Sequence, residues 1–120
     1  MRNQPHPEPT LNESQFAEMQ DLFDEDFVPL IEQYLKDTQT RLDDLNKAID
    51  TGDFKQASDL AHTQKGASAN IGASEVERIS FQMQSASDAK DTDLQKSVLS
   101  SLTDAVKRSH QEINQRLAAL

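Results

Sequence analysis

The chain has 120 residues, no cysteine and few aromatic residues (5%), which suits one domain with a single core and excludes disulfide or thiolate chemistry. Its net charge of −9 disfavours binding to nucleic acid or to an anionic membrane surface, because both would repel it. No apolar run approaches the roughly 20 residues of a membrane span or forms the core of a signal peptide, so we expect a soluble, cytoplasmic protein.

Residues 1–9 differ in composition from the rest of the chain. Residues 1–9 contain three prolines at alternate positions, and each proline removes an amide donor and disfavours helix in the residue before it. We therefore expect a disordered tail over residues 1–9, with no role for His6, and one folded domain over residues 10–120. Asn12 followed by Gln15 resembles a capping box and predicts a short first helix. Its apolar residues are Phe16, Met19 and Phe23.

A long apolar stripe with a period of about 3.6 residues predicts a second helix. The acidic residues 24–26 come directly before the stripe and complement the positive end of a helix dipole. Pro29 is tolerated only in a first turn, so we expect the helix to begin near Asp26, and Gly52 suits a left-handed cap at its end. The stripe consists of Phe27, Leu30, Ile31, Tyr34, Leu35, Leu42, Leu45 and Ile49.

A third helix follows directly. Asp53 with Gln56 is a capping pattern, the helix is expected to run to about Asn70, and Gly72 closes it. Its inward side is formed by Ala57, Leu60, Ala67 and Ile71.

Two further helices complete the chain. Ser74 with Glu77 resembles a capping box that opens a fourth helix, and after a polar break at residues 88–91, Thr92 with Gln95 opens the last one. Their expected inward residues are Val76, Ile79, Met83 and Ala86, then Leu94, Val98, Leu102, Val106, Ile113 and Leu117. These helices and short loops predict an all-α fold, an antiparallel up-down four-helix bundle with a short additional N-terminal helix. A single four-helix core accounts for the apolar stripes of all the helices. No apolar face is then left for a second copy, so we expect a monomer.

The outward face of the third helix carries the candidate site. His62, Lys65 and Gly66 lie three and four residues apart and therefore share one face of the helix. Glycine inside a helix costs roughly 1 kcal/mol relative to alanine, so something must benefit from the missing side chain. We interpret Gly66 as the space through which another molecule approaches His62.

The run from Ala61 to Ala73 resembles the signature of histidine-containing phosphotransfer (HPt) domains of bacterial two-component phosphorelays. Four positions match that signature in type and spacing: His62, Lys65, Gly66 and Gly72. In that family the histidine accepts a phosphoryl group from an aspartate of one receiver domain and passes it to an aspartate of another. The resemblance therefore implies a phosphocarrier.

The resemblance also implies a role for each residue. Neutral imidazole is a nucleophile at cytoplasmic pH, so His62 would be phosphorylated. Lys65 would partly neutralise the phosphoryl oxygens, and Gln84 on the following helix would accept a hydrogen bond from the imidazole and fix its orientation. The implied partners are receiver domains of a hybrid sensor histidine kinase and of a response regulator. We expect docking residues around His62 at Ser58, Asp59, Ala69, Arg78, Gln82 and Ser85.

We expect no cofactor or metal on this chain, because the receiver domain would bring the Mg²⁺ along with the aspartate. The sequence has three glycines and no glycine-rich phosphate loop, so it does not describe a kinase that uses ATP. One residue departs from the family. The second residue after the histidine is usually a large aliphatic, and here it is Gln64. This position faces the core, where we expect Gln64 to reach a hydroxyl such as that of Ser68 or to slide toward the bundle end.

Two other classes of function are open. Asp59 and His62 have the spacing of a carboxylate and a histidine in helical di-iron sites, but no second such pair exists and Asp59 is expected to face outward. A non-catalytic adaptor that binds receiver domains would keep the bundle and lose transfer, and a distortion of the third helix at Gln64 would favour it. His110 is expected to be a partly exposed helix residue, because no lysine and glycine follow it at the family spacing.

Overall fold

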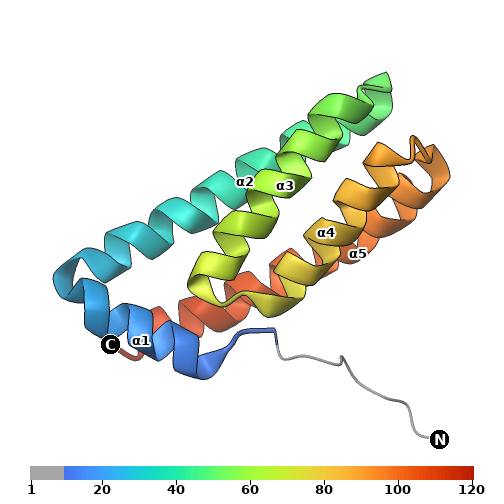
Figure 1. Cartoon of the computed structure of the whole chain (residues 1–120). Coiled ribbons are helices and arrows are strands. Elements are labelled where there is room, and N and C mark those ends of the chain that lie inside the picture. Colours follow the sequence, from blue (N-terminus) through green and yellow to red (C-terminus); the bar gives the residue numbers. More distant parts are fainter. Residues whose placement is uncertain (1–9) are drawn as a thin grey trace, which may run out of the picture.

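The computed structural model describes residues 10–120 of the chain. A short helix, α1 (Glu13–Phe23), and a 3₁₀ turn, η1 (Asp24–Asp26), lead into four long helices (Figure 1). These helices are α2 (Phe27–Thr51), α3 (Phe54–Ile71), α4 (Ser74–Asp88) and α5 (Thr92–Ala118). The expectations of a disordered tail over residues 1–9 and of no role for His6 lie outside the described residues.

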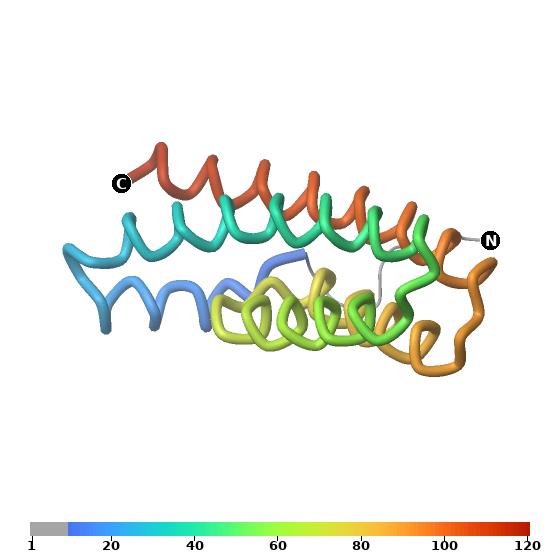
Figure 2. The backbone as a smooth tube through the Cα atoms, turned by 90° about the horizontal axis from the view of Figure 1, so that it is seen from above, coloured from blue at the N-terminus to red at the C-terminus, as the bar shows by residue number. Residues whose placement is uncertain are grey.

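The four long helices form a ring in which each packs against two neighbours, in the order α2, α3, α4, α5 and back to α2. Figure 2 shows the ring as two layers, with α2 and α5 in one and α3 and α4 in the other. Consecutive helices run antiparallel, so the predicted up-down four-helix bundle is confirmed. Within residues 10–120 no helix is both long enough and apolar enough to cross a membrane.

Helix α1 covers one end of the bundle, where it contacts α2 and α3. The buried Phe16 ring meets the Phe27 ring edge-on, with the ring centroids 5.1 Å apart. The Asn12 amide donates to the Gly72 carbonyl at 2.7 Å. Gly72 has a φ of +82°, and a Cβ at this position would lie 3.2 Å from the Asn12 carbonyl oxygen. Glycine is thus required here both for the left-handed turn that ends α3 and for the close approach of the N-terminal segment.

The core lies on the inner faces of all four long helices, and the inward residues predicted for α4 are all buried. The Glu75 side chain of α4 is also fully buried, and Arg108 of α5 donates from Nε and Nη2 to its two carboxylate oxygens at 3.1 and 2.8 Å. This bidentate ion pair joins α4 to α5. Representative core residues are Ile31, Leu45, Ala57, Ala61, Val76, Met83, Leu102, Val106 and Ile113.

Two predicted caps are wrong by one residue. Ala73, not Ser74, precedes the first helical residue of α4, because the left-handed Gly72 and the non-helical Ala73 turn the chain directly into the new helix. Asp91, not Thr92, caps α5, and its carboxylate accepts a hydrogen bond from the Leu94 amide at 3.0 Å. The caps predicted at Asn12 and Asp53 are confirmed, since each side chain accepts from the amide three residues on.

Three apolar residues expected to face inward are exposed instead: Phe23, Leu30 and Leu94. In the first turn of α5 the inward position belongs to Gln95, which is buried and donates to the Ser87 hydroxyl at 3.0 Å, so Leu94 is turned outward. Phe23 and Leu30 lie at the corner between α1 and α2, where they line an open groove rather than the core.

Candidate functional site

His62 lies near the middle of α3 with its side chain exposed, on the face opposite the buried Ala61 and Ile71 side. Gly66 is exposed one turn further along the same face, and a Cβ at this position would meet no atom within 4 Å. The packing of this chain therefore gives no reason for glycine at position 66, even though glycine weakens a helix interior by roughly 1 kcal/mol. The open space beside His62 is available to another molecule.

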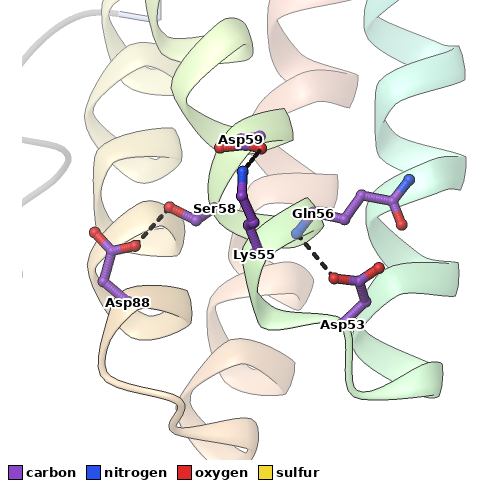
Figure 3. A network of polar contacts seen from close by, with 6 residues as sticks. All are labelled: Asp53, Lys55, Gln56, Ser58, Asp59 and Asp88. Carbon is purple, nitrogen blue, oxygen red and sulfur yellow. Dashed lines mark hydrogen bonds and ion pairs between the residues drawn. The ribbon is translucent and has the colours of Figure 1, made fainter.

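Two contacts fix the antiparallel register of α3 against α4. The Ser58 hydroxyl of α3 donates to Asp88 of α4 at 2.6 Å (Figure 3), and Lys65 Nζ lies 5.1 Å from the centroid of the Phe81 ring. Four residues beyond Ser58 along α3 is His62, and four residues before Asp88 along α4 is Gln84. His62 and Gln84 thus lie at the same level of two packed antiparallel helices.

Gln84 is half-buried, and its amide oxygen is buried without a hydrogen-bond partner among the described residues. A buried amide oxygen that accepts no hydrogen bond is unfavourable. A hydrogen bond from a donor at this level of the bundle to the Gln84 oxygen would therefore be favourable. The hydrogen bond between Gln84 and the imidazole of His62 stays a prediction, which the shared level of the two residues supports.

The other predicted docking residues differ in their exposure. On α3, Ser58 and Ala69 are half-buried, whereas Asp59 is exposed and forms an ion pair with Lys55 at 2.8 Å (Figure 3). On α4, Gln82 and Ser85 are exposed and Arg78 is half-buried. The docking role of this set stays a prediction.

Sequence reasoning did not select Phe81, which lies between two of the predicted docking residues of α4. Its ring is 54% exposed and stands against the Lys65 side chain. The signal was present in the spacing, because residue 81 is three positions after Arg78 and four before Ser85 and so shares their face of the helix.

Gln64 is buried behind His62 and is fully hydrogen-bonded. Its Nε2 donates to the hydroxyls of Thr38 and Ser68, at 3.0 Å each, and its Oε1 accepts from Arg41 Nε at 2.6 Å. The prediction that this side chain reaches the Ser68 hydroxyl is confirmed. Tyr34 completes the cluster with a hydroxyl contact of 2.8 Å to Ser68, and burial raises the pKa of its phenol, so Tyr34 stays neutral.

The cluster of Gln64, Tyr34, Thr38, Ser68 and Arg41 joins α2 to α3 by side-chain hydrogen bonds. Helix α3 is continuous from Phe54 to Ile71. The atypical glutamine therefore does not interrupt the helix that carries His62.

An open groove of about 610 Å³ begins on the α2 side of this face, between α1, α2 and α3. Ala67 and Asn70, which come one and four residues after Gly66, form its α3 wall. Its apolar lining comes mainly from Met19, Leu22, Phe23, Leu30 and Ile71.

A metal centre finds no support in the part of the chain that the structure describes. No group of three histidine, cysteine, aspartate or glutamate side chains is placed to hold an ion there. Asp59, the carboxylate of the di-iron alternative, is exposed and paired with Lys55.

A model of the Hpt domain family matches residues 29–119. Among solved structures, the chain is similar to histidine-containing phosphotransfer protein B (HptB) from Pseudomonas aeruginosa PAO1, with a TM-score of 0.90 and 19% identity over 93% of this chain and 97% of that chain. It is also similar to the histidine-containing phosphotransfer protein MtHPt2 from Medicago truncatula, with a TM-score of 0.74 and 23% identity over 92% of this chain and 82% of that chain. A search of curated proteins finds no match.

Proposed function

We propose, because the chain belongs to the Hpt domain family, that His62 accepts a phosphoryl group from the aspartate of a receiver domain and passes it to the aspartate of another. The donor would be the receiver domain of a hybrid sensor histidine kinase and the acceptor that of a response regulator. The observation that carries this proposal is the exposed His62 beside Gly66. No atom of this chain occupies the space that a side chain at position 66 would fill.

The transfer needs only a positioned nucleophile from this chain. One ring nitrogen of His62 attacks the phosphorus of the acyl phosphate, an N–P bond forms, and the P–O bond breaks with its electron pair leaving on the partner's carboxylate. The proton on the other ring nitrogen stays in place and is held by the amide oxygen of Gln84. The Mg²⁺ belongs to the receiver domain, and no ATP is consumed by this chain. The reverse sequence delivers the phosphoryl group to the acceptor.

Lys65 is the cation that the phosphoryl group would meet. It lies one turn from His62, and a unit charge about 4 Å from a phosphoryl charge near −2 is attracted by roughly 2 kcal/mol in water, before screening by salt. That magnitude stabilises the phosphorylated state without trapping it, as a carrier that must release the group requires.

Gly66 and the neighbouring groove give the receiver domain a place to approach. From the exposed His62 and Gly66 the surface of α3 continues to the half-buried Ala67 and the exposed Asn70, which border the groove. A partner loop can come close to the helix backbone at Gly66 while an apolar surface of the same partner lies along the groove. Partners that exchange quickly need such a modest interface.

The adaptor alternative loses its main argument. A distortion of α3 at Gln64 would have favoured it, but α3 is an unbroken helix in which Gln64 is fully hydrogen-bonded.

The test is incubation of the protein with a phosphorylated receiver domain and Mg²⁺, following the label on the wild type, on His62→Ala and on His110→Gln. His110 lies on α5 and is the matched control for loss of a histidine. We expect acid-labile, alkali-stable label on the wild type and on His110→Gln, and none on His62→Ala, whose helicity should be unchanged because its side chain is exposed. Label that persists on His62→Ala, or no label from any of several receivers, would contradict the proposal.

A further inference from the structure

We propose that Phe81 is a positioning residue for Lys65. Its ring holds the Lys65 ammonium in the unphosphorylated protein, and phosphorylation of His62 draws that ammonium from the ring to the phosphoryl oxygens, which uncovers the ring face. This inference rests on the proposed function for its second half, while the contact in the resting protein stands independently of it.

The resting contact is a cation–π pair between neighbouring helices. Lys65 Nζ lies 5.1 Å from the centroid of the Phe81 ring, within the range of about 6 Å in which a ring attracts an ammonium. Lys65 is half-buried, and no carboxylate of residues 10–120 forms an ion pair with it. Among residues 10–120 the Phe81 ring is therefore the group that the Lys65 ammonium contacts.

The core does not account for the aromatic ring at position 81. Its ring is 54% exposed, so it contributes little to the core, whose α4 side is formed by Ile79 and Met83. The ring borders a hollow of about 450 Å³ that Lys65, Ser74, Glu77 and Arg78 also line. Only an aromatic ring at position 81 offers a face to the ammonium.

The Lys65 ammonium can reach either the Phe81 ring or a phosphoryl group on His62. His62 lies three residues before it on the same helix face, so a phosphoryl group on His62 would be within reach of the same flexible side chain. An exposed cation–π contact is weaker than attraction to a group that carries nearly two negative charges. Phosphorylation therefore moves the ammonium, and the phosphorylated and unphosphorylated forms present different surfaces to a receiver domain.

The resting contact is tested by nuclear magnetic resonance on the unphosphorylated protein, comparing the wild type with Phe81→Leu and Phe81→Tyr. Ring currents should displace the Lys65 side-chain methylene resonances in the wild type. The displacement should disappear in Phe81→Leu and be retained in Phe81→Tyr, which keeps the ring. Both variants should fold, because the ring is largely exposed. Equal Lys65 resonances in the wild type and Phe81→Leu would overturn the proposal.

The second half is tested with phosphoramidate, a small donor that needs no receiver domain. Its P–N bond breaks, an N–P bond to His62 forms, and the amine leaves as ammonia. We expect the Lys65 resonances of the phosphorylated wild type to move to their positions in Phe81→Leu, and those of His62→Ala to stay unchanged. Lys65 resonances that keep their ring-current displacement after phosphorylation would overturn the release of Lys65.

A quantitative readout separates this role from a merely structural one. Removal of the ring removes the competitor for the ammonium in the unphosphorylated state only. Phe81→Leu should therefore raise the equilibrium constant for phosphorylation of His62 by about two- to fivefold, and Phe81→Tyr should match the wild type. An unchanged or lowered constant in Phe81→Leu would contradict the competition. Failure of wild-type His62 to take up the phosphoryl group would instead overturn the proposed function and the release step with it, leaving the resting contact to the first comparison.

Discussion

Replacement of Gln64 by leucine tests whether the buried polar cluster stabilises the bundle. Leucine is the kind of large aliphatic that HPt domains usually carry at this position, and it fills a similar volume, so the cavity term is small. The change removes the three hydrogen bonds of 3.0 Å or shorter, from Gln64 to Thr38, to Ser68 and from Arg41, together with a longer one of 3.5 Å to the Tyr34 hydroxyl. The outcome depends on what each former partner can do without the amide.

The three partners are affected differently. Ser68 keeps the Tyr34 hydroxyl at 2.8 Å, and the half-exposed Arg41 can turn to water. Thr38 is only 2% exposed and loses the Gln64 amide, which leaves the Tyr34 hydroxyl as its side-chain partner, and weakened hydrogen bonding of a buried polar group costs about 1–3 kcal/mol. We therefore expect Gln64→Leu to lower the free energy of unfolding by about 2 kcal/mol, and the double variant Gln64→Leu/Thr38→Val to recover at least half of that, because both polar partners are then removed.

Urea denaturation followed by far-ultraviolet circular dichroism measures both variants against the wild type. A Gln64→Leu variant as stable as the wild type would refute the reasoning, since it would mean that the cluster only compensates for its own burial. A double variant no more stable than the single one would show that the loss does not arise at Thr38.

Three further predictions concern other parts of the bundle. Burial lowers the pKa of His110, so below about pH 6.5 the unfolded chain binds more protons than the folded one, and the free energy of unfolding falls as the pH decreases. Urea titrations between pH 7 and 5 should show a smaller fall in His110→Gln than in the wild type, and equal falls would refute this. Gly66→Leu should slow phosphoryl transfer while Gly66→Ala raises stability by about 1 kcal/mol, and a destabilised Gly66→Ala would show that position 66 is not open. Arg108→Met should destabilise the protein by about 1.5–3 kcal/mol in urea titrations because it removes two charge-assisted hydrogen bonds to the buried Glu75 carboxylate, so a loss below that of an exposed ion pair would contradict this account.

Periodicity and glycine positions were sufficient to predict the bundle, because both report directly on the backbone. Gly52 and Gly72 each have a positive φ and end the helices they were expected to end. The cap of α5 was misplaced because Asp91 and Thr92 are adjacent polar candidates for the same role. The cap of α4 was misplaced because the left-handed turn at Gly72 places Ala73, which has no capping side chain, directly before the helix. Leu94 was placed inward for a similar reason, since an apolar stripe does not show that a polar Gln95 occupies the buried position in a first turn.

Features of the candidate site that lie within one helix could be predicted from the sequence. Contacts between two helices could not. The shared face of His62, Lys65 and Gly66 follows from helical spacing alone. The contact between Lys65 and Phe81 requires the register of α3 against α4, which no pattern within either helix specifies. The choice of Thr38 and Arg41 as additional partners of Gln64 likewise depends on the register of α2 against α3.

The position of His62 within the bundle suits a carrier that meets two partners in turn. Helix ends fray, but His62 lies near the middle of an 18-residue helix that packs against α2 on one side and α4 on the other. The Gln64 cluster and the Ser58 to Asp88 hydrogen bond hold α3 to these two neighbours. A partner therefore meets a nucleophile whose backbone is already fixed, and little binding energy is spent on ordering it. A small interface is then enough for transfer, and a small interface is also what allows one receiver domain to leave before the next arrives.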